Sequence, residues 1–338
     1  MLSHATATQP STLDSAGSPS VLIVVLNWNS HEETIAAIRS ISTMDYPNCR
    51  TVVIDNGSTD DSAEQLEKMA SDRVRFIRLP ENRGFTGGCN VGLDLALRDG
   101  DDYVWLLNSD AVTDVNTLSS LVRVAEADKT IGLVSPKIAS LDEPSKLLNV
   151  GGLYEPELPY YRSTKDIRKA REWAASCPER IMLVGTALLI RVDMVRRIGP
   201  LDLEMFAYWE DTDLSLRSIK AGFRNVVDFE SVVYHKEKTI DGKYHELKPH
   251  YWYYMARNEI RFWKKHANFK ARLKPLWWQY GGQLEYLKHP NVSDKSRQAI
   301  LAGLWHGWLS RTGSYHGDIR MPRILGRLIE FHSRVRKT

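Results

Sequence analysis

Four polar segments in the first third of the chain each directly follow a short apolar segment. They are N-W-N at 27–29, D-N-G-S-T-D at 55–60, N-R-G-F-T-G-G-C-N at 82–90 and N-S-D at 108–110. Any one of them suits a simple turn, because Asn, Asp and Gly are common turn residues. Carboxylate and amide oxygens are also ligands that Mg²⁺ accepts. Together the four segments could therefore bind a cation and the phosphates that it neutralises.

Acidic residues and a histidine further along the chain offer chemistry of another kind. Glu210 and Asp211 are adjacent in Y-W-E-D-T-D-L, and a carboxylate there could take a proton from a reacting hydroxyl. Alternatively, these acids complement the dipole of a helix N-terminus, which suits Asp213 better. His235 follows an apolar segment and could bind a metal or simply end a strand. Asp110 could likewise only cap the next helix.

The elements that would position these residues alternate regularly over the first 135 residues. Between the apolar segments lie helical patterns, the third of which stops at Gly100. This alternation is typical of a mainly parallel, doubly wound α/β sheet, in which ligands bind outside the carboxyl ends of the strands. The four polar segments follow strands and would share that edge. The predicted strands are 21–26, whose sequence is continuously apolar and β-branched, and 51–54, 74–79, 103–107 and 131–135.

The second part of the chain has a less regular pattern. Residues 136–180 are charged and contain Pro and Tyr, and 181–191 then predicts one strand, with antiparallel pairing as an option. A helix is expected at 211–222, with acidic residues in its first turn and a terminal Gly. Residues 226–235 predict another strand or strand pair. We expect a smaller antiparallel part here.

Charge is distributed unevenly, although the net charge of the 338 residues is only +3. Residues 251–338 carry 17 Lys and Arg against 5 Asp and Glu, and hold six of the ten Trp residues. Such a segment suits an anionic partner, and 251–266 in particular could lie at a membrane interface. The alternative is a solvated basic helical subdomain whose Trp residues pack on the main body. A nucleic-acid partner would leave the acidic sheet edge unexplained, so none is expected.

Composition and motifs exclude several classes. Three scattered Cys residues indicate neither a disulfide framework nor a zinc site, which fits a reducing cytosol. The longest apolar run, 181–190, is about half of a membrane-spanning helix. Residues 1–19 lack a basic start and an apolar core, so they predict a disordered leader and not a signal peptide. Neither a dinucleotide-binding G-x-G-x-x-G nor a P-loop is present.

Five motifs in one order resemble the family 2 inverting glycosyltransferases with the GT-A fold, and most of all their bacterial rhamnosyltransferase-like branch. The resemblance covers about residues 20–265. Together with composition it divides the chain into a leader at 1–19, a catalytic domain at 20–250 and a basic aromatic helical extension at 251–338, and this basic tail lies outside the resemblance. The catalytic domain would divide into a nucleotide-binding half, 20–135, and an acceptor half, 136–250. The motifs are V-V-L-N-W-N, I-D-N-G-S-T-D, E-N-R-G-F-T-G-G-C-N-V-G, L-L-N-S-D-A and Y-W-E-D-T-D-L.

The resemblance assigns roles on the donor side of the site. Asp55 resembles the aspartate that pairs with the uracil or thymine ring of the nucleotide. Asp110 resembles the last acid of the D-x-D motif, which holds Mg²⁺ or Mn²⁺ against the diphosphate, and His235 lies where related enzymes place a third metal ligand. Asn108 replaces the first D-x-D carboxylate, so we expect weaker metal dependence because an amide brings no charge. The other nucleotide-binding residues implied are Asn27, Asn29, Asn82, Arg83 and Gly84.

On the acceptor side, Asp211 resembles the catalytic base, with Glu210 as the next choice. The preceding aromatics, Tyr208 and Trp209, could belong to the core or offer their faces to a sugar acceptor. Gly185 and Thr186 interrupt an apolar segment, which indicates either close approach of the donor sugar or simple packing.

The function implied is transfer of a sugar, first of all L-rhamnose, from a dTDP- or UDP-linked donor. The acceptor would be a hydroxyl of a glycan or of a polyprenyl-diphosphate-linked glycan, in cell-surface polysaccharide synthesis. The protein would work in the cytoplasm or on the inner face of the membrane, as a monomer or a homo-oligomer. Two alternatives stay open: a non-catalytic nucleotide-sugar or carbohydrate-binding protein on the same fold, and a sugar-1-phosphate nucleotidyltransferase. The second lacks the Gly- and Arg/Lys-rich loop expected after its first strand.

Overall fold

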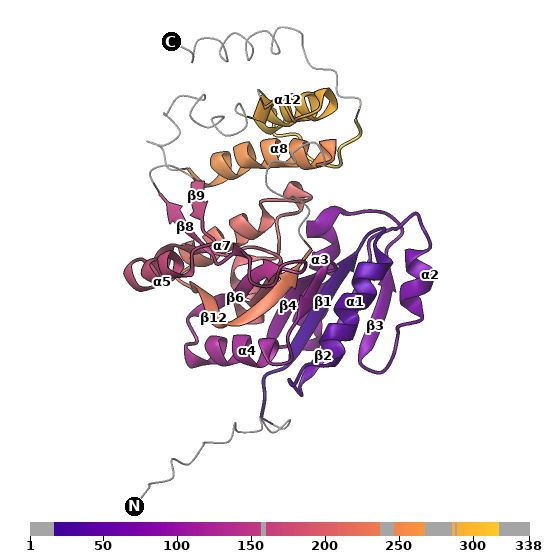
Figure 1. Cartoon of the computed structure of the whole chain (residues 1–338), viewed down its shortest axis with the longest axis vertical. Helices are drawn as coiled ribbons and strands as arrows, with labels where there is room; N and C mark the ends of the chain where they lie inside the picture. Colours follow the sequence, from indigo (N-terminus) through magenta and orange to yellow (C-terminus); the bar gives the residue numbers. More distant parts are fainter. Residues whose placement is uncertain (1–16, 157–159, 237–246, 268–285, 288, 318–338) are drawn as a thin grey trace, which may run out of the picture.

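Figure 1 shows the computed structural model of the chain, in which a twisted sheet lies between helices and a pair of helices is stacked against one end. The predicted leader, 1–19, lies outside the described residues except for its last three positions. Parts of the predicted extension, 251–338, also lie outside them. The described residues are 17–156, 160–236, 247–267, 286–287 and 289–317.

Parallel strands form the first half of the central sheet, as the sequence predicts. Asn27 at the end of β1 is the register partner of Asp55 at the end of β2, and Leu26 is the partner of Asn108 in β4. The polar residues after these strands therefore meet at one edge of the sheet. The strands lie in the order β3 (Val74–Arg78), β2 (Cys49–Asp55), β1 (Val21–Asn27), β4 (Tyr103–Asn108).

Helices cover both faces of this sheet because successive strand residues point to opposite sides. Residues of α1 (His31–Ser42) and α4 (Thr117–Ala127) pack on one face, and α2 (Ser62–Glu67) packs beside α1. On the other face, α3 (Gly84–Asp99) lies very close to β1. A Cβ at Gly88 would stand 2.3 Å from Leu26 Cδ1, so a larger residue there would force the Leu26 side chain to shift. The third predicted helix begins at Gly84, inside the glycine-rich segment.

Further strands extend the sheet with mixed directions. β11 (Ala187–Arg191) lies antiparallel between β4 and β6 (Ile131–Ser140), and β12 (Arg224–His235) runs parallel to β6. β6 and β12 therefore run in the direction of β4, and the described sheet is mainly parallel, as predicted. Two short strands complete it: β5 (Ala111–Thr113), antiparallel to β12, and β7 (Leu147–Asn149), antiparallel to β6.

The single strand predicted at 181–191 is wrong, because two strands in two different sheets share this segment. β10 (Ile181–Met182) belongs to a small antiparallel sheet with β8 (Gly152–Glu155) and β9 (Tyr160–Ser163), whereas β11 joins the main sheet. Between them, the Leu183 amide donates to Ser215 Oγ and the Gly185 amide donates to Asp211 Oδ2. Ser215 and Asp211 belong to the helix α7 (Glu210–Lys220). These two bonds turn the chain between β10 and β11 away from the extended conformation of a strand.

Four helical segments lie between β9 and the acidic pair, which is Glu210 and Asp211. α5 (Ile167–Ser176) and the 3₁₀ turn Pro178–Arg180 precede β10, and α6 (Val192–Ile198) follows β11. A second 3₁₀ turn, Leu203–Met205, leads into α7 (Glu210–Lys220). Residues of α6 and α7 join α3 in covering their face of the sheet.

α8 (Pro249–His266) and α12 (Asp294–Trp308) form the helical pair at one end of the molecule (Figure 1). Their contact buries Trp252, Tyr253 and Tyr254 of α8 against Ile300 and Leu304 of α12. The aromatic stretch expected at a membrane interface therefore packs inside the protein, as the alternative interpretation predicts. Within the described residues, no helix is long and apolar enough to span a bilayer.

Candidate active site

The first polar cluster of the site joins the ends of β1 and β2. Asn27 Nδ2 donates to Asp55 Oδ1 (2.8 Å), and both side chains are fully buried. The Ser58 hydroxyl and amide donate to the same carboxylate at 2.5 and 3.1 Å. Asn29, which is exposed and has a positive φ of 52°, pairs with Thr59 through its side-chain oxygen. The structure thus brings Asn27, Asn29 and Asp55 together. Within this cluster the buried Asp55 carboxylate accepts hydrogen bonds from Asn27 and Ser58.

A second cluster joins the loop after β2 to the start of α3. Asn56, which sequence reasoning did not single out, accepts from the Arg83 amide and donates to Asn82 Oδ1 and to the Gly84 carbonyl. Its own Asp-Asn-Gly segment suits an ordinary turn, so no sequence signal set it apart. The Arg83 side chain is exposed. The Asn82–Gly84 loop is therefore held against the Asp55 loop at this edge of the sheet.

Gly84 connects this loop to the acidic pair. Its φ is +73°, and a Cβ there would lie 2.4 Å from the Phe206 carbonyl oxygen. Two residues further on, the Thr86 amide donates to that same carbonyl (3.1 Å). The amide is in the first turn of α3, where it has no partner within the helix. The segment before α7 thus caps α3. This contact fixes the Asn82–Gly84 loop relative to the segment that contains Phe206.

Asp110, His235 and Asn108 form the candidate metal centre. His235 Nε2 lies 3.0 Å from Asp110 Oδ1 and 3.5 Å from Asn108 Nδ2. The pairing of β12 with β5 places His235 opposite Ala111, immediately after Asp110, so residues 125 positions apart meet. Asp110 is 7% exposed. A carboxylate oxygen, an imidazole nitrogen and an amide at one partly buried point fit a divalent cation.

The acidic pair reaches this centre through the turn between β10 and β11. Asp211 Oδ2 accepts from the Gly185 amide (2.8 Å), and the neighbouring Thr186 carbonyl accepts from the Asn108 amide (2.9 Å). Asp211 Oδ1 accepts from the Thr212 amide at 2.6 Å. A continuous series of contacts therefore links Asp211 to the Asp110–His235 pair, with Gly185 and Thr186 between them.

Glu210 and Asp211 are adjacent but differ in their surroundings. Burial, followed by the charge of Asp211, raises the pKa of Glu210 from 4.5 to about 8. Its Oε2 is buried and has no hydrogen-bond partner among the described residues. Burial also raises the pKa of Asp211, but amides of Gly185 and Thr212 oppose that effect by stabilising its charged form. At neutral pH Glu210 therefore holds a proton more readily than Asp211 does.

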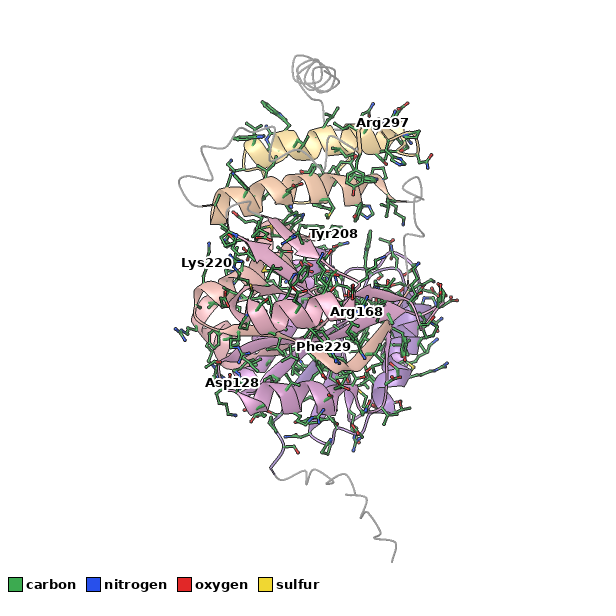
Figure 2. The ribbon with its side chains drawn as sticks, turned by 60° about the vertical axis from the view of Figure 1, so that its left-hand side comes forward. Asp128, Arg168, Tyr208, Lys220, Phe229 and Arg297 are labelled. Carbon is green, nitrogen blue, oxygen red and sulfur yellow. The ribbon has the colours of Figure 1, made fainter. Side chains whose placement is uncertain are left out.

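The two aromatics before the pair are only partly exposed. Tyr208 stacks edge-on against Tyr251, and Trp209 packs on Phe262 of α8. Figure 2 shows Tyr208 at the junction between α8 and the main body. Both residues and Phe206 have positive φ values, of 67°, 73° and 63°, which cost about 1–3 kcal/mol each and are common at functional sites. These conformations were not foreseen from the sequence.

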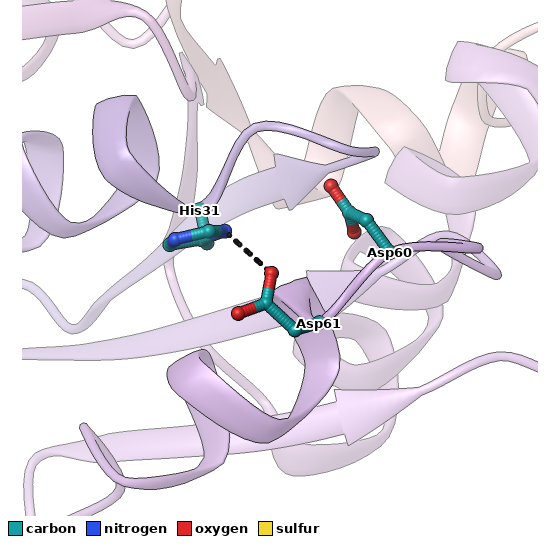
Figure 3. A group of neighbouring side chains, drawn as sticks. All are labelled: His31, Asp60 and Asp61. Atoms are coloured by element: carbon teal, nitrogen blue, oxygen red, sulfur yellow. Dashed lines mark ion pairs between the residues drawn. The ribbon is translucent and has the colours of Figure 1, made fainter.

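A separate acidic group lies near the start of α1. His31, Asp60 and Asp61 present ligand atoms within 4.8 Å of one another (Figure 3). His31 Nδ1 is 3.6 Å from Asp61 Oδ1, and Asp60 accepts from the Ser62 amide. Both acids are exposed, and Asp60 binds the Ser62 amide at the start of α2, so the group has an ordinary local role.

Comparison with known proteins adds a family to this geometry. The sequence profile described as glycosyl transferase family 2 matches residues 20–199, which is more than half of the chain. The chain belongs to glycosyl transferase family 2. The predicted GT-A fold of this family 2 chain is borne out by solved structures. One is a mannosyltransferase from Pyrobaculum calidifontis, in complex with GDP-mannose and Mn²⁺. It has a TM-score of 0.52 and 16% identity, and the match covers 96% of this chain and 82% of that one.

Two curated relatives of the family 2 chain show how far the sequence likeness extends. Galactofuranosyltransferase GlfT1 of Mycolicibacterium smegmatis is 26% identical over 214 residues, covering 60% of this chain and 66% of the relative. This chain thus spans just under two thirds of that relative's length. The N-acetylglucosaminyl-diphospho-decaprenol L-rhamnosyltransferase of Mycobacterium tuberculosis is 26% identical over 301 residues, covering 82% of this chain and 94% of the relative.

Proposed function

We propose that the chain is an inverting glycosyltransferase that moves a sugar from a nucleoside-diphosphate donor to an acceptor hydroxyl. The observation that carries the proposal is the series of contacts joining Asp211 to the Asp110–His235 pair. It puts a carboxylate base and a cation-binding pair at the same sheet edge, with the Gly185–Thr186 turn between them. A single displacement needs both groups, one on each side of the sugar.

Asp211 takes the proton of the acceptor hydroxyl as its oxygen attacks the anomeric carbon. The bond between that carbon and the donor's β-phosphate oxygen breaks, and the nucleoside diphosphate leaves. Inversion follows from this one-step attack on the opposite face. General-base assistance of this kind contributes about 10²–10⁴ in rate. The Gly185 and Thr212 amides keep Asp211 charged and fix its direction, while protonated Glu210 adds no competing charge.

Asp110 and His235 would hold Mg²⁺ or Mn²⁺, which supplies charge stabilisation for the departing diphosphate. Asn108 contributes an amide at the position of a carboxylate in D-x-D, so the dependence on metal is weaker than with two acids. Asn27, Asn29 and Asp55 would line the nucleoside pocket, with Asn82, Arg83 and Gly84 closing over the nucleotide. Tyr208 and Trp209 would border the acceptor.

For the donor we propose dTDP-L-rhamnose first, with UDP-galactofuranose and other UDP-sugars next. For the acceptor we propose a glycan carried on a polyprenyl diphosphate, in cell-surface polysaccharide synthesis at the inner face of the membrane. The support is the sequence likeness to an L-rhamnosyltransferase whose name specifies a decaprenol-linked acceptor and to a galactofuranosyltransferase. The basic segment 251–338 would favour an anionic membrane or acceptor.

The test is a thermal-shift panel of dTDP-, UDP- and GDP-sugars, with and without Mg²⁺ or Mn²⁺, followed by turnover of each hit with a polyprenyl-diphosphate glycan analogue. We expect a dTDP- or UDP-sugar to raise the Tm more with metal than without, and to yield the free nucleoside diphosphate and an inverted glycoside. Binding of a donor without turnover on any glycan acceptor would favour a binding protein. Release of inorganic pyrophosphate from a nucleoside triphosphate and a sugar phosphate would favour a nucleotidyltransferase.

A further inference from the structure

The backbone just before the acidic pair is held in an unfavourable shape. Phe206, Tyr208 and Trp209 all have positive φ, a region that side chains other than Gly rarely adopt. Trp209 is the N-cap of α7, so Glu210 and Asp211 follow it directly. Such a backbone persists only when its surroundings over-determine it. The groups that enforce this shape therefore determine where the two carboxylates lie.

One side chain from α8 binds most of this segment. Asn258 Nδ2 donates to the carbonyl oxygens of Met205, Ala207 and Tyr208, each at 2.8 Å. Asn258 is fully buried, so water does not compete for these bonds. Three carbonyls can converge on one amide group only if the chain curls around it. The positive φ values of the segment provide that curl.

Arg257 fixes the orientation of this amide and extends the contact. Its Nε donates to Asn258 Oδ1 at 2.9 Å, so the amide must turn its Nδ2 toward the segment. Arg257 Nη2 donates to the Met205 carbonyl at 2.6 Å and to the Glu204 carbonyl at 3.1 Å. The guanidinium is itself fully buried and stacks near Tyr254. Two adjacent residues of α8 thus bind four of the five successive carbonyls of residues 204–208.

The same helix also holds α7 beyond the acidic pair. Asp213 is fully buried and accepts from His266 Nε2 (2.7 Å), Lys265 Nζ (2.8 Å) and Arg217 Nε (2.7 Å). Burial alone would raise the pKa of Asp213, but these partners, His266 foremost, lower it below its usual range. Asp213 therefore serves as an anchor for α8 and not mainly as a dipole partner. Asp211 lies between this anchor and the Asn258 bonds.

We propose that Arg257 and Asn258 are positioning residues that aim the Asp211 carboxylate, so that the catalytic site extends into α8. This inference rests on the proposed function, in which Asp211 is the base. It also places the functional boundary of the catalytic part beyond residue 250. The residues act through the backbone of 204–209 and need no contact with substrate.

The test compares Asn258→Ala and Arg257→Lys with Lys264→Met in the full-length chain. Lys264 lies on the same helix but donates to the Trp308 carbonyl of α12 (2.7 Å), so its variant controls for loosened helix packing. We expect the two positioning variants to lower kcat about 100-fold, the scale of effect of a small misplacement, with the donor KM nearly unchanged. Lys264→Met should keep its kcat.

Amide hydrogen exchange provides a readout that does not require turnover. In Asn258→Ala and Arg257→Lys, exchange over residues 203–211 should rise at least tenfold relative to wild type, while β1 and β4 keep their protection. If all three variants kept the wild-type kcat and the wild-type exchange rates, both expressed per folded molecule, the inference would be overturned. If wild type itself transfers no sugar, the proposed function fails, whereas the exchange data still decide whether α8 holds the segment.

Discussion

At the scale of single residues, Glu210 and Asp211 give the most direct prediction. Only Asp211 has its carboxylate fixed by the Gly185 amide, so we expect Asp211→Asn to lower kcat by about 10²–10⁴. Binding of the nucleoside diphosphate, measured by calorimetry, should be unchanged. Glu210→Gln should keep most of the turnover, and the exposed Asp193→Asn serves as the matched control. A larger loss in Glu210→Gln than in Asp211→Asn would move the base to Glu210.

The metal assignment can be tested with two histidines. His235 contacts Asp110 at the sheet edge, whereas His31 belongs to the exposed group with Asp60 and Asp61. His235→Gln should raise the Mn²⁺ concentration for half-maximal activity by about tenfold, the usual scale for losing a metal-supporting group. His31→Gln should leave it unchanged. Activity is measured over a Mn²⁺ titration, and the reverse pattern would transfer the metal to the exposed group.

The raised pKa of Glu210 predicts a pH dependence of stability. The folded protein keeps this proton up to a pH of about 8, whereas the unfolded chain releases it near its ordinary pKa of 4.5. The stability that the protonated group contributes is therefore full below the unfolded value and is lost as pH rises toward 8. The Tm of Glu210→Gln, relative to wild type, should rise steadily between about pH 5 and 8. The exposed control, Glu172→Gln, should show no such trend.

At the scale of elements, the start of α3 packs closely against the segment that precedes α7. Gly84 and Gly100 have φ values of +73° and +80°, but of the two only Gly84 would bring a Cβ against a neighbour, the Phe206 carbonyl oxygen at 2.4 Å. Gly100→Ala should cost about 1–2 kcal/mol for the left-handed conformation alone. Gly84→Ala should cost more and also raise the donor KM, because it separates the loop from the acidic pair.

Urea unfolding of both variants and their donor KM values check this prediction. Equal losses of stability would mean that the Phe206 segment simply moves aside, and that the contact with α3 does not fix the two loops. A KM change in Gly100→Ala would equally weaken the assignment, since that glycine has open space around its Cβ position.

The elements also show which parts of the fold were predictable. The strands predicted at 21–26 and 51–54 occur as β1 and β2, and their parallel register brings Asn27 to Asp55. The division of 181–191 does not follow, because the interruption by Gly185 and Thr186 is equally compatible with one continuous strand, and the turn is fixed by distant partners such as Ser215. Local periodicity carries no record of such long-range bonds.

At the site, the same distinction separates residues that were predicted from those that were missed. Asp110 and Asp211 occur in motifs, whereas His235 ends a predicted strand, and contacts in the structure link all three. Arg257 and Asn258 were treated only as part of a basic aromatic helix. A signal was nevertheless present, because these two polar residues interrupt a stretch, 251–263, that is rich in aromatic and apolar residues. Buried polar groups require partners, so they indicate a packed contact and not a lipid-facing one.

At the scale of the whole molecule, the remaining question is how the basic end of the chain reaches an anionic partner. Removing everything after residue 250 would also delete Arg257 and Asn258 and disturb the acidic pair. A chain ending at residue 317 keeps α8 and α12 and removes only 318–338, which carry six Arg and Lys against two acids. Each basic residue near an anionic membrane contributes about 1 kcal/mol.

We therefore expect the full-length chain to co-sediment with anionic vesicles at least about tenfold more strongly than the chain ending at 317. Binding should fall as salt rises, because the Debye length shortens from about 10 Å at 0.1 M to about 3 Å at 1 M. Turnover on a short, soluble acceptor analogue should be equal for the two chains, since the site is intact in both. Neutral vesicles provide the control. Equal pelleting of both chains would show that 318–338 does not carry the attraction, and the membrane would have to meet another surface.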